Sequence, residues 1–247
     1  MTKIASEDNS SGKEMPLIAH IRELRSVLIR CICAVIACAI PCGVYWKEIF
    51  DAIVEHTLKL CESQSVHIIY TAPAETVMLS VKIALICGLI LASPIVFQQI
   101  WGFISPALYK KEKILVLPTA IASTICFLAG VVFSSYTLPF VLQFLTEFAA
   151  GGLDPFFRVD EYLGFLVKIA LSFGIAFQLP VIVFVLSKIG LIDHKFLIRY
   201  FRYAIVLIFI VAAILTPPDI FSQLLLGTPL LVLYAFSILI SFFARKK

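Results

Sequence analysis

The chain has 247 residues, of which 61% are hydrophobic and only 15% are charged, with a formal net charge of +4 and a mean hydropathy of +1.01. A water-soluble domain carries about 25% charged residues, so this composition excludes a soluble globular fold and indicates a membrane protein. The polar residues 1–14 are not followed by the short apolar run and small-residue cleavage site of a secretory signal peptide. We therefore expect the first apolar segment to remain in the protein.

Six apolar segments are candidates for membrane crossings. A helix rises about 1.5 Å per residue, so about 20 residues cross a hydrocarbon core of about 30 Å. The fold class predicted is an all-α integral membrane protein, whose transmembrane domain covers residues 16–243 between a polar tail at 1–15 and a basic tail at 244–247. The predicted spans are residues 27–46, 76–99, 114–135, 162–187, 200–215 and 220–243.

The fifth and sixth spans are expected to form a short, tight hairpin. Thr216 is followed by Pro217 and Pro218, which end the fifth helix because proline has no backbone N–H and restricts the residue before it. Asp219 opens the sixth helix at once, where an N-cap is its default role. The hairpin would leave a thin or tilted region at the far surface of the membrane.

The basic residues predict the orientation. Fifteen of the twenty Lys and Arg residues fall on the side that holds both termini, three fall on the opposite side, and Lys82 and Lys168 lie within spans. This bias places both termini in the cytoplasm by the positive-inside rule. The basic clusters are short and lie next to the membrane, so they suit anionic lipid and make nucleic acid an improbable partner.

Two segments on the outer side are expected to form a small cap. Residues 47–73 include apolar positions at helical spacing, which predict a short amphipathic helix, and Val66 to Thr71 are expected to be extended. The second segment, residues 136–160, is predicted to be an acidic loop with a flexible point at Gly151–Gly152.

Residues 75–94 and 161–180 resemble each other at an offset of 86. The likeness is either a parallel repeat of a helical hairpin or a chance similarity between apolar segments. In both cases the matching Pro94 and Pro180 predict a kink at a similar depth. Lys82 and Lys168 are each seven residues from a glutamate, so they are expected to extend toward it at the outer interface; an ion or substrate pathway is the alternative.

Glu23 and Glu112 stand out on the side that holds the termini. Neither has Lys or Arg three or four residues away in the sequence, so no cation of the same helix neutralises it. Such carboxylates could receive arginine from another molecule, because its planar guanidinium binds a carboxylate bidentately. The alternative is that Glu23 is solvated and that Glu112 favours the N-terminus of the third span through the helix dipole.

Gln178 lies well inside the fourth span, where an amide needs a hydrogen-bonding partner. Thr216 and Gln223 of the hairpin are the candidates. The sequence contains neither H-E-x-x-H nor G-x-S-x-G, and Gly12-Lys13 lacks the earlier glycine of a nucleotide-binding P-loop. We therefore predict no catalytic residue, no metal site and no cofactor, so energy for any work would come from a partner or an ion gradient.

Three motifs carry a resemblance to a known family. They are Glu23-Leu24-Arg25 before the first span, Phe103-Ile104-Ser105-Pro106-Ala107-Leu108-Tyr109 followed by Lys110-Lys111-Glu112, and Leu215-Thr216-Pro217-Pro218-Asp219-Ile220-Phe221-Ser222-Gln223. Together with six spans in this order, they resemble TatC, the receptor subunit of the twin-arginine protein translocase. The resemblance covers the chain from about residue 15.

The resemblance implies a receptor that binds twin-arginine signal peptides of folded precursors in the bacterial inner membrane. It implies that Glu23 and Glu112 meet the two arginines, supported by Arg25 and Phe103. It further implies recruitment of single-span TatA and TatB proteins, self-association in a larger complex, and export driven by the proton-motive force. The fold expected from it is a concave, glove-like arrangement in which Pro106, Pro180, Pro217, Pro218 and Asp219 have structural roles.

In this family a buried polar residue of the fourth span, often Glu, faces partner helices. Here the position is Gln178, which cannot ionise, so hydrogen bonding rather than proton transfer is expected, with Thr216 and Gln223 in the same polar patch. The alternative function is a secondary transporter of a small solute that uses Lys82, Lys168 and Gln178 at the midplane. A transporter concentrates its unpaired polar residues there, whereas the longest motif surrounds Glu112 at the surface.

Overall fold

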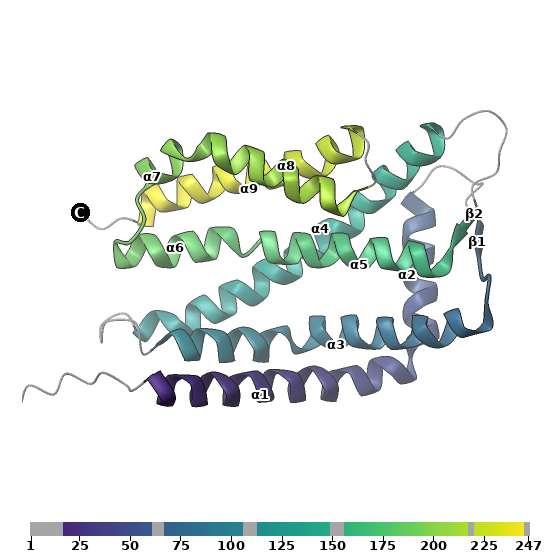
Figure 1. Ribbon diagram of the computed structural model, residues 1–247, viewed down its shortest axis with the longest axis horizontal. Coiled ribbons are helices and arrows are strands. Elements are labelled where there is room, and N and C mark those ends of the chain that lie inside the picture. Colours follow the sequence, from purple (N-terminus) through teal and green to yellow (C-terminus); the bar gives the residue numbers. More distant parts are fainter. Residues whose placement is uncertain (1–16, 61–66, 106–112, 149–155, 217–219, 245–247) are drawn as a thin grey trace, which may run out of the picture.

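The computed structural model describes residues 17–60, 67–105, 113–148, 156–216 and 220–244 (Figure 1). Five stretches are long and apolar enough to cross a membrane, and a sixth, Phe201–Leu215, is shorter. These findings confirm the predicted all-α membrane fold. In chain order the elements are α1 (Leu17–Val44), α2 (Trp46–Leu60), β1 (His67–Ile69), α3 (Pro73–Ile104), a 3-10 turn (Lys113–Leu115), α4 (Val116–Phe148), β2 (Phe156–Arg158), α5 (Val159–Ala176), α6 (Leu179–Ile189), α7 (His194–Arg199), α8 (Phe201–Leu215) and α9 (Ile220–Ala244).

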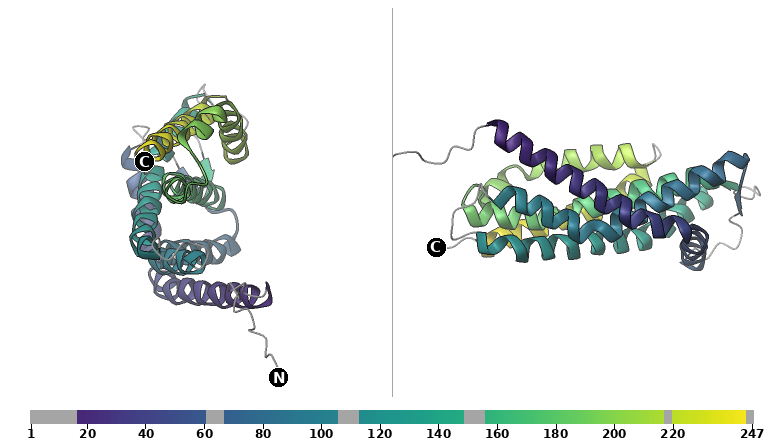
Figure 2. Two further views of the ribbon diagram at one scale, coloured as in Figure 1. Left: turned by 90° about the vertical axis from the view of Figure 1, so that its left-hand side faces the viewer. Right: turned by 90° about the horizontal axis from the view of Figure 1, so that it is seen from below.

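The helices form an open, concave arrangement. Seen along the spans, α1 lies at one tip of a C-shaped outline and the α8–α9 hairpin at the other (Figure 2). Helix α2 runs crosswise to the spans at the end opposite to that where α1 begins and α9 ends (Figure 1). This shape agrees with the glove-like fold that the sequence motifs imply.

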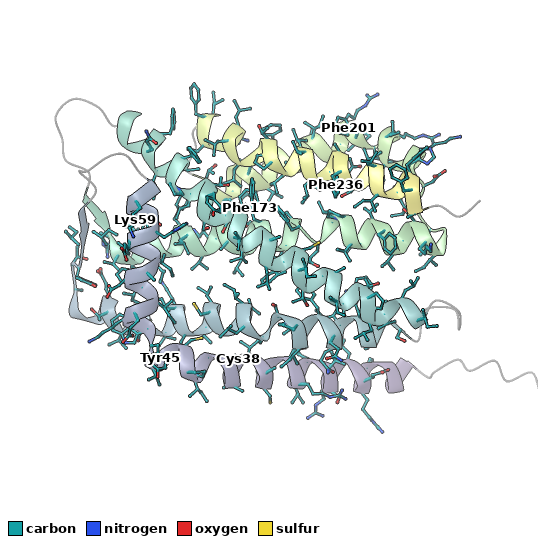
Figure 3. All side chains as sticks on the ribbon, turned by 180° about the vertical axis from the view of Figure 1, so that it is seen from behind. Cys38, Tyr45, Lys59, Phe173, Phe201 and Phe236 are labelled. Atoms are coloured by element: carbon teal, nitrogen blue, oxygen red, sulfur yellow. The ribbon has the colours of Figure 1, made fainter. Side chains whose placement is uncertain are left out.

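Glycines allow the spans to approach closely. A Cβ at Gly88 of α3 would lie 2.8 Å from the backbone of Ala39 in α1, and one at Gly130 of α4 would lie 2.6 Å from the carbonyl oxygen of Phe173 in α5. Phe173 is fully buried at the centre of the main core (Figure 3). Small residues at such crossings are a common means of packing helices inside a membrane, where lipid tails are as apolar as the side chains.

Proline divides the fourth span into α5 and α6. A turn at Phe177 and Gln178 separates the two helices, and Pro180 follows with no N–H to continue the hydrogen-bond ladder. The helix is therefore interrupted just before Pro180, and the kink predicted there stays a prediction. Its counterpart Pro94 lies inside α3, which continues past it as one helix.

The two segments predicted to form a cap contain strands that pair with each other. Strand β1 lies parallel to β2, with His67 opposite Phe156 and Ile69 opposite Arg158. The amphipathic helix and the extended segment predicted for residues 47–73 are present as α2 and β1. The loop predicted for residues 136–160 is wrong in its first half, because α4 continues to Phe148.

Candidate functional site

Glu23 and Arg25 lie near the start of α1, at the end of the molecule where α3 also ends (Figure 1). Glu23 is half-buried, Arg25 is exposed, and Glu23 forms no ion pair within the described ranges. The next arginine, Arg30, is already engaged, because it donates to Oε1 of Gln99 in α3 at 3.0 Å and to Oγ of Ser26 at 2.9 Å. A carboxylate with this exposure can accept a cation from outside the chain.

Phe103 lies in the last turn of α3 and is half-buried, at the same end as Glu23. Helix α1 crosses α3 obliquely (Figure 2), and a tight contact between them lies at Gly88 and Ala39. Pro106 and Glu112, which complete the predicted signal-peptide motif, lie outside the described residues.

Gln178 is 9% exposed and lies at the turn between α5 and α6. Its Nε2 donates to the carbonyl oxygen of Ser123 in α4 at 3.1 Å and more weakly to that of Gly174 at 3.4 Å. The sequence analysis offered Thr216 and Gln223 as candidate hydrogen-bonding partners of Gln178. In the structure its partners are backbone carbonyl groups instead. Gln178 also lines an apolar groove of about 420 Å³ between α3 and α6.

Gln223 links α9 to α8, whereas Thr216 is bonded within the last turn of α8. Thr216 is buried and donates to the carbonyl oxygen of Ala212 at 2.9 Å, while Nε2 of Gln223 donates to that of Phe209 at 2.9 Å. Within the described part of the chain, neither is hydrogen-bonded to Gln178. Pro217, Pro218 and Asp219, predicted between the two helices, lie outside that part.

Ion pairs at the end of the molecule that carries the β1–β2 cap differ from those expected. Lys82 pairs with Asp160, whereas Glu75 pairs with Arg158 and accepts hydrogen bonds from Thr71. The expectation that Lys82 reaches Glu75 is therefore wrong. Both pairs link α3 to the start of α5, and the hydrogen bond and charge of Glu75 raise the pKa of Arg158. Strand β2 ends at Arg158, so these pairs hold the cap against the spans.

Lys168 has no such partner among the residues that the structure describes. It is exposed on the face of α5 opposite the core residues Ile169 and Phe173, and it forms no ion pair in the described ranges. The two lysines of the sequence likeness thus have different environments, which removes the symmetrical pair of midplane cations that the transporter alternative uses.

Ser123 connects three helices, and sequence reasoning did not find it. The residue is 1% exposed, its Oγ accepts from Trp101 Nε1 of α3 at 2.8 Å, and its carbonyl oxygen accepts from Gln178. The signal in the sequence that could have identified Ser123 is a serine among apolar residues, at the same depth in the membrane as Gln178. The cross-links through Ser123 fix the end of α3 that carries Phe103 relative to α6.

These spans, the concave arrangement and the polar links between helices define a multi-pass helical membrane protein. Residues 19–229 match the family model described as Sec-independent protein translocase protein (TatC). The chain belongs to the TatC family, whose members are protein translocase components and not enzymes. Membership in a translocase family replaces the small-solute transporter alternative.

Relatives of that description match over most of their length. The protein from Helicobacter pylori J99 is 39% identical over 223 residues, covering 90% of this chain and 87% of the relative. Those from Aquifex aeolicus and Carboxydothermus hydrogenoformans are 37% and 35% identical, and cover 94% and 95% of this chain and 97% and 96% of the relatives. A solved structure described as the twin arginine translocase receptor TatC has a TM-score of 0.80 at 36% identity, covering 91% of this chain and 99% of that one.

Proposed function

We propose that this chain is the receptor and scaffold of a twin-arginine translocase. In this proposal it binds the signal peptides of folded precursors at the end where α1 begins, recruits TatA- and TatB-type single-span proteins, and supports export driven by the proton-motive force. The observation that carries the proposal is Glu23, a half-buried carboxylate at that end with no ion pair among the described residues.

Glu23 and Glu112 would each receive one arginine of the signal peptide. Partial burial favours this role, because a guanidinium–carboxylate pair is stronger where water is partly excluded. Arg30 is held by Gln99 and Ser26, so it does not compete for Glu23. Arg25 and Phe103 would border the site, the first supplying charge and the second an apolar contact.

Partner helices would dock where polar side chains meet the membrane. Gln223 is half-buried, and its Oε1 has capacity to accept a further hydrogen bond while Nε2 is held by Phe209. Thr216 borders the same hairpin, and Gln178 offers an amide at the edge of the α3–α6 groove. A polar side chain of a single-span helix would gain a hydrogen bond worth about 0.6–1.7 kcal/mol at such a position.

The orientation proposed has both termini in the cytoplasm and the β1–β2 cap on the outer side of the bacterial inner membrane. The distribution of basic residues supports it. Four prolines and one aspartate would have structural roles, because they would end or kink helices and cap α9. These residues are Pro106, Pro180, Pro217, Pro218 and Asp219. Self-association in a larger complex within the bilayer completes the proposal.

Site-specific photocrosslinking tests the receptor function. A photoreactive amino acid is placed at position 103 or 112 in inverted membrane vesicles that contain the Tat partner proteins and a radiolabelled precursor. The precursor carries either Arg-Arg or Lys-Lys in its signal peptide. Crosslinks that form with Arg-Arg and are lost with Lys-Lys are expected, and equal crosslinking, or none with either precursor while the protein is folded and inserted, refutes the proposal.

A matched pair of variants tests the role of Glu23. Glu23→Ala is expected to reduce the Arg-Arg crosslink about tenfold, the effect of about 1.4 kcal/mol lost from a charge-assisted pair. Glu48→Ala removes an equally charged, exposed residue at the opposite end of the molecule and is expected to leave the crosslink unchanged. Equal crosslinking in the two variants would exclude Glu23 from the site.

A further inference from the structure

A long apolar groove lies between α4, α6 and α9. Its volume is about 780 Å³, and its described lining residues include none of those proposed above to bind a signal peptide or a partner helix. The lining is formed almost entirely by aliphatic and aromatic side chains; one of these is Phe236 of α9 (Figure 3). The hydroxyl of Thr119 donates to the carbonyl oxygen of Leu115, so it has no hydrogen left to donate to a ligand.

The groove is as long as one leaflet of a bilayer. Its lining runs from Leu115 to Ala129 on α4, from Phe177 to Lys188 on α6, and from Leu233 to Ala244 on α9. At about 1.5 Å per residue these stretches measure about 17–21 Å, a little more than half of a hydrocarbon core of about 30 Å. An occupant that crosses the whole membrane would not match this length.

The two ends of the groove differ. One end lies where α4 begins and α6 and α9 end, which is a membrane surface (Figure 1). The other end lies near mid-membrane at Phe177, whose ring packs against that of Phe133 with centroids 5.7 Å apart and against that of Phe173 at 6.5 Å. An aromatic cluster therefore closes the groove in the middle of the bilayer.

Lys188 lies at the surface end. It is half-buried, it is the one charged residue among the described lining, and it forms no ion pair in the described ranges. Beside it, the hydroxyls of Ser187 and Ser241 are hydrogen-bonded at 2.7 Å and hold α6 against α9. The lysine thus lies at the surface end of an apolar groove whose walls α6 and α9 are joined beside it.

We propose that this groove binds an anionic phospholipid, with an acyl chain between α4, α6 and α9 and the head-group phosphate paired with Lys188. The groove matches a lipid in length, in its closed mid-membrane end and in the position of its positive charge. A transmembrane helix would need a groove that continues past Phe177. A zwitterionic lipid also carries a phosphate, but its own ammonium group offsets the attraction to Lys188. In the orientation proposed above, this lipid belongs to the cytoplasmic leaflet.

Photoactivatable lipids test the proposal on the full chain. The protein is reconstituted in nanodiscs of phosphatidylcholine and phosphatidylglycerol, with a diazirine at the acyl-chain end of one lipid or the other, and crosslinked peptides are identified by mass spectrometry. The phosphatidylglycerol probe is expected to label peptides that contain Ala129, Phe177 or Leu233. Its labelling should exceed that of phosphatidylcholine about fivefold, the contribution of one interfacial lysine.

Two variants, each with a matched control, test whether the labelled lipid lies in this groove. Lys188→Gln is expected to abolish the fivefold preference, whereas Lys195→Gln removes an exposed lysine of α7 outside the groove and preserves it. Ala129→Phe fills the deep end from an exposed position and is expected to abolish labelling there, whereas Ala213→Phe on the exposed face of α8 does not.

Four results would overturn the proposal. The first is equal labelling by the two lipids, and the second is a preference that survives Lys188→Gln. The third is uniform labelling of all membrane-facing helices, which means annular lipid only. Protection of these peptides by a co-purified single-span protein would likewise assign the groove to a helix rather than a lipid.

Discussion

Gly88→Ala is expected to push α1 away from α3 and to loosen the packing between the two helices. The new Cβ would lie 2.8 Å from Cα, Cβ and N of Ala39, whereas unstrained carbon contacts are about 3.5–4.0 Å, so the two helices must separate by about 1 Å. Both partners are backbone or directly attached to it, so no side chain can rotate away. Helix α1 packs almost entirely on α3, and little else can hold it in place.

The expected cost follows from this overlap. Overpacking of a well-packed contact destabilises by about 1–3 kcal/mol. Replacing glycine by alanine in a helix stabilises the protein by about 0.5–1 kcal/mol, because alanine has the higher helix propensity. The free energy of unfolding of Gly88→Ala should therefore fall by about 1–2 kcal/mol, and the Arg-Arg crosslink should fall with it because α1 carries Glu23.

Unfolding titrations in mixed detergent and SDS micelles measure this difference. Gly164→Ala is the matched control, because a Cβ at Gly164 in α5 meets no atom within 4 Å. Its free energy of unfolding should stay the same or rise by at most about 1 kcal/mol. The reasoning fails if Gly88→Ala is as stable as the wild type, or if both alanine variants lose the same stability.

Two further predictions concern links between spans. Lys82→Met and Asp160→Asn, combined in a double-mutant cycle, should give a coupling energy of about 0.5–1 kcal/mol, because both side chains are more than one-third exposed; zero coupling would contradict the pair. Trp101→Phe removes the hydrogen bond to Ser123 and should lower the free energy of unfolding by about 0.6–1.7 kcal/mol in the same titration, with an unchanged value as the contrary result.

Features that depend on local sequence could be predicted. The amphipathic spacing of residues 47–60 predicted α2, and the prolines after Thr216 predicted the end of α8 at Leu215. Pro180 predicted the break between α5 and α6. Each of these signals is a property of a few consecutive residues, so it does not depend on which helix lies beside the segment.

Features that depend on neighbouring helices could not be predicted. Lys82 has Glu75 on its own helix face, yet it pairs with Asp160, because parallel pairing of β1 with β2 brings the start of α5 to this end of α3. Glu75 is then available to Arg158. The extension of α4 was missed for a similar reason. Leu138, Val141 and Leu142 are 1–4% exposed, and their burial against other helices favours the continuation of α4 beyond residue 135, where the predicted span ended.

At the candidate site, too, local features could be predicted from the sequence, whereas contacts with neighbouring helices could not. Sequence indicated that Glu23 lacks a cation on its own helix, and no ion pair with it forms within the described residues. Sequence also indicated that Gln178 needs a partner, but it named side chains of the hairpin instead of the carbonyl of Ser123. A backbone acceptor is present at every residue, so only the three-dimensional packing selects which one an amide reaches.

The role of Gln178 can be separated from proton transfer by two substitutions. Gln178→Glu should be tolerated, because a protonated carboxyl group can still donate one hydrogen bond to the carbonyl of Ser123, 3.1 Å from the present donor. Gln178→Leu has no donor and should lose about 0.6–1.7 kcal/mol in the unfolding titration. The contrary outcome is that the Gln178→Glu variant fails to fold while the Gln178→Leu variant is stable. It would mean that the hydrogen bond of this side chain does not join α4 to the α5–α6 turn.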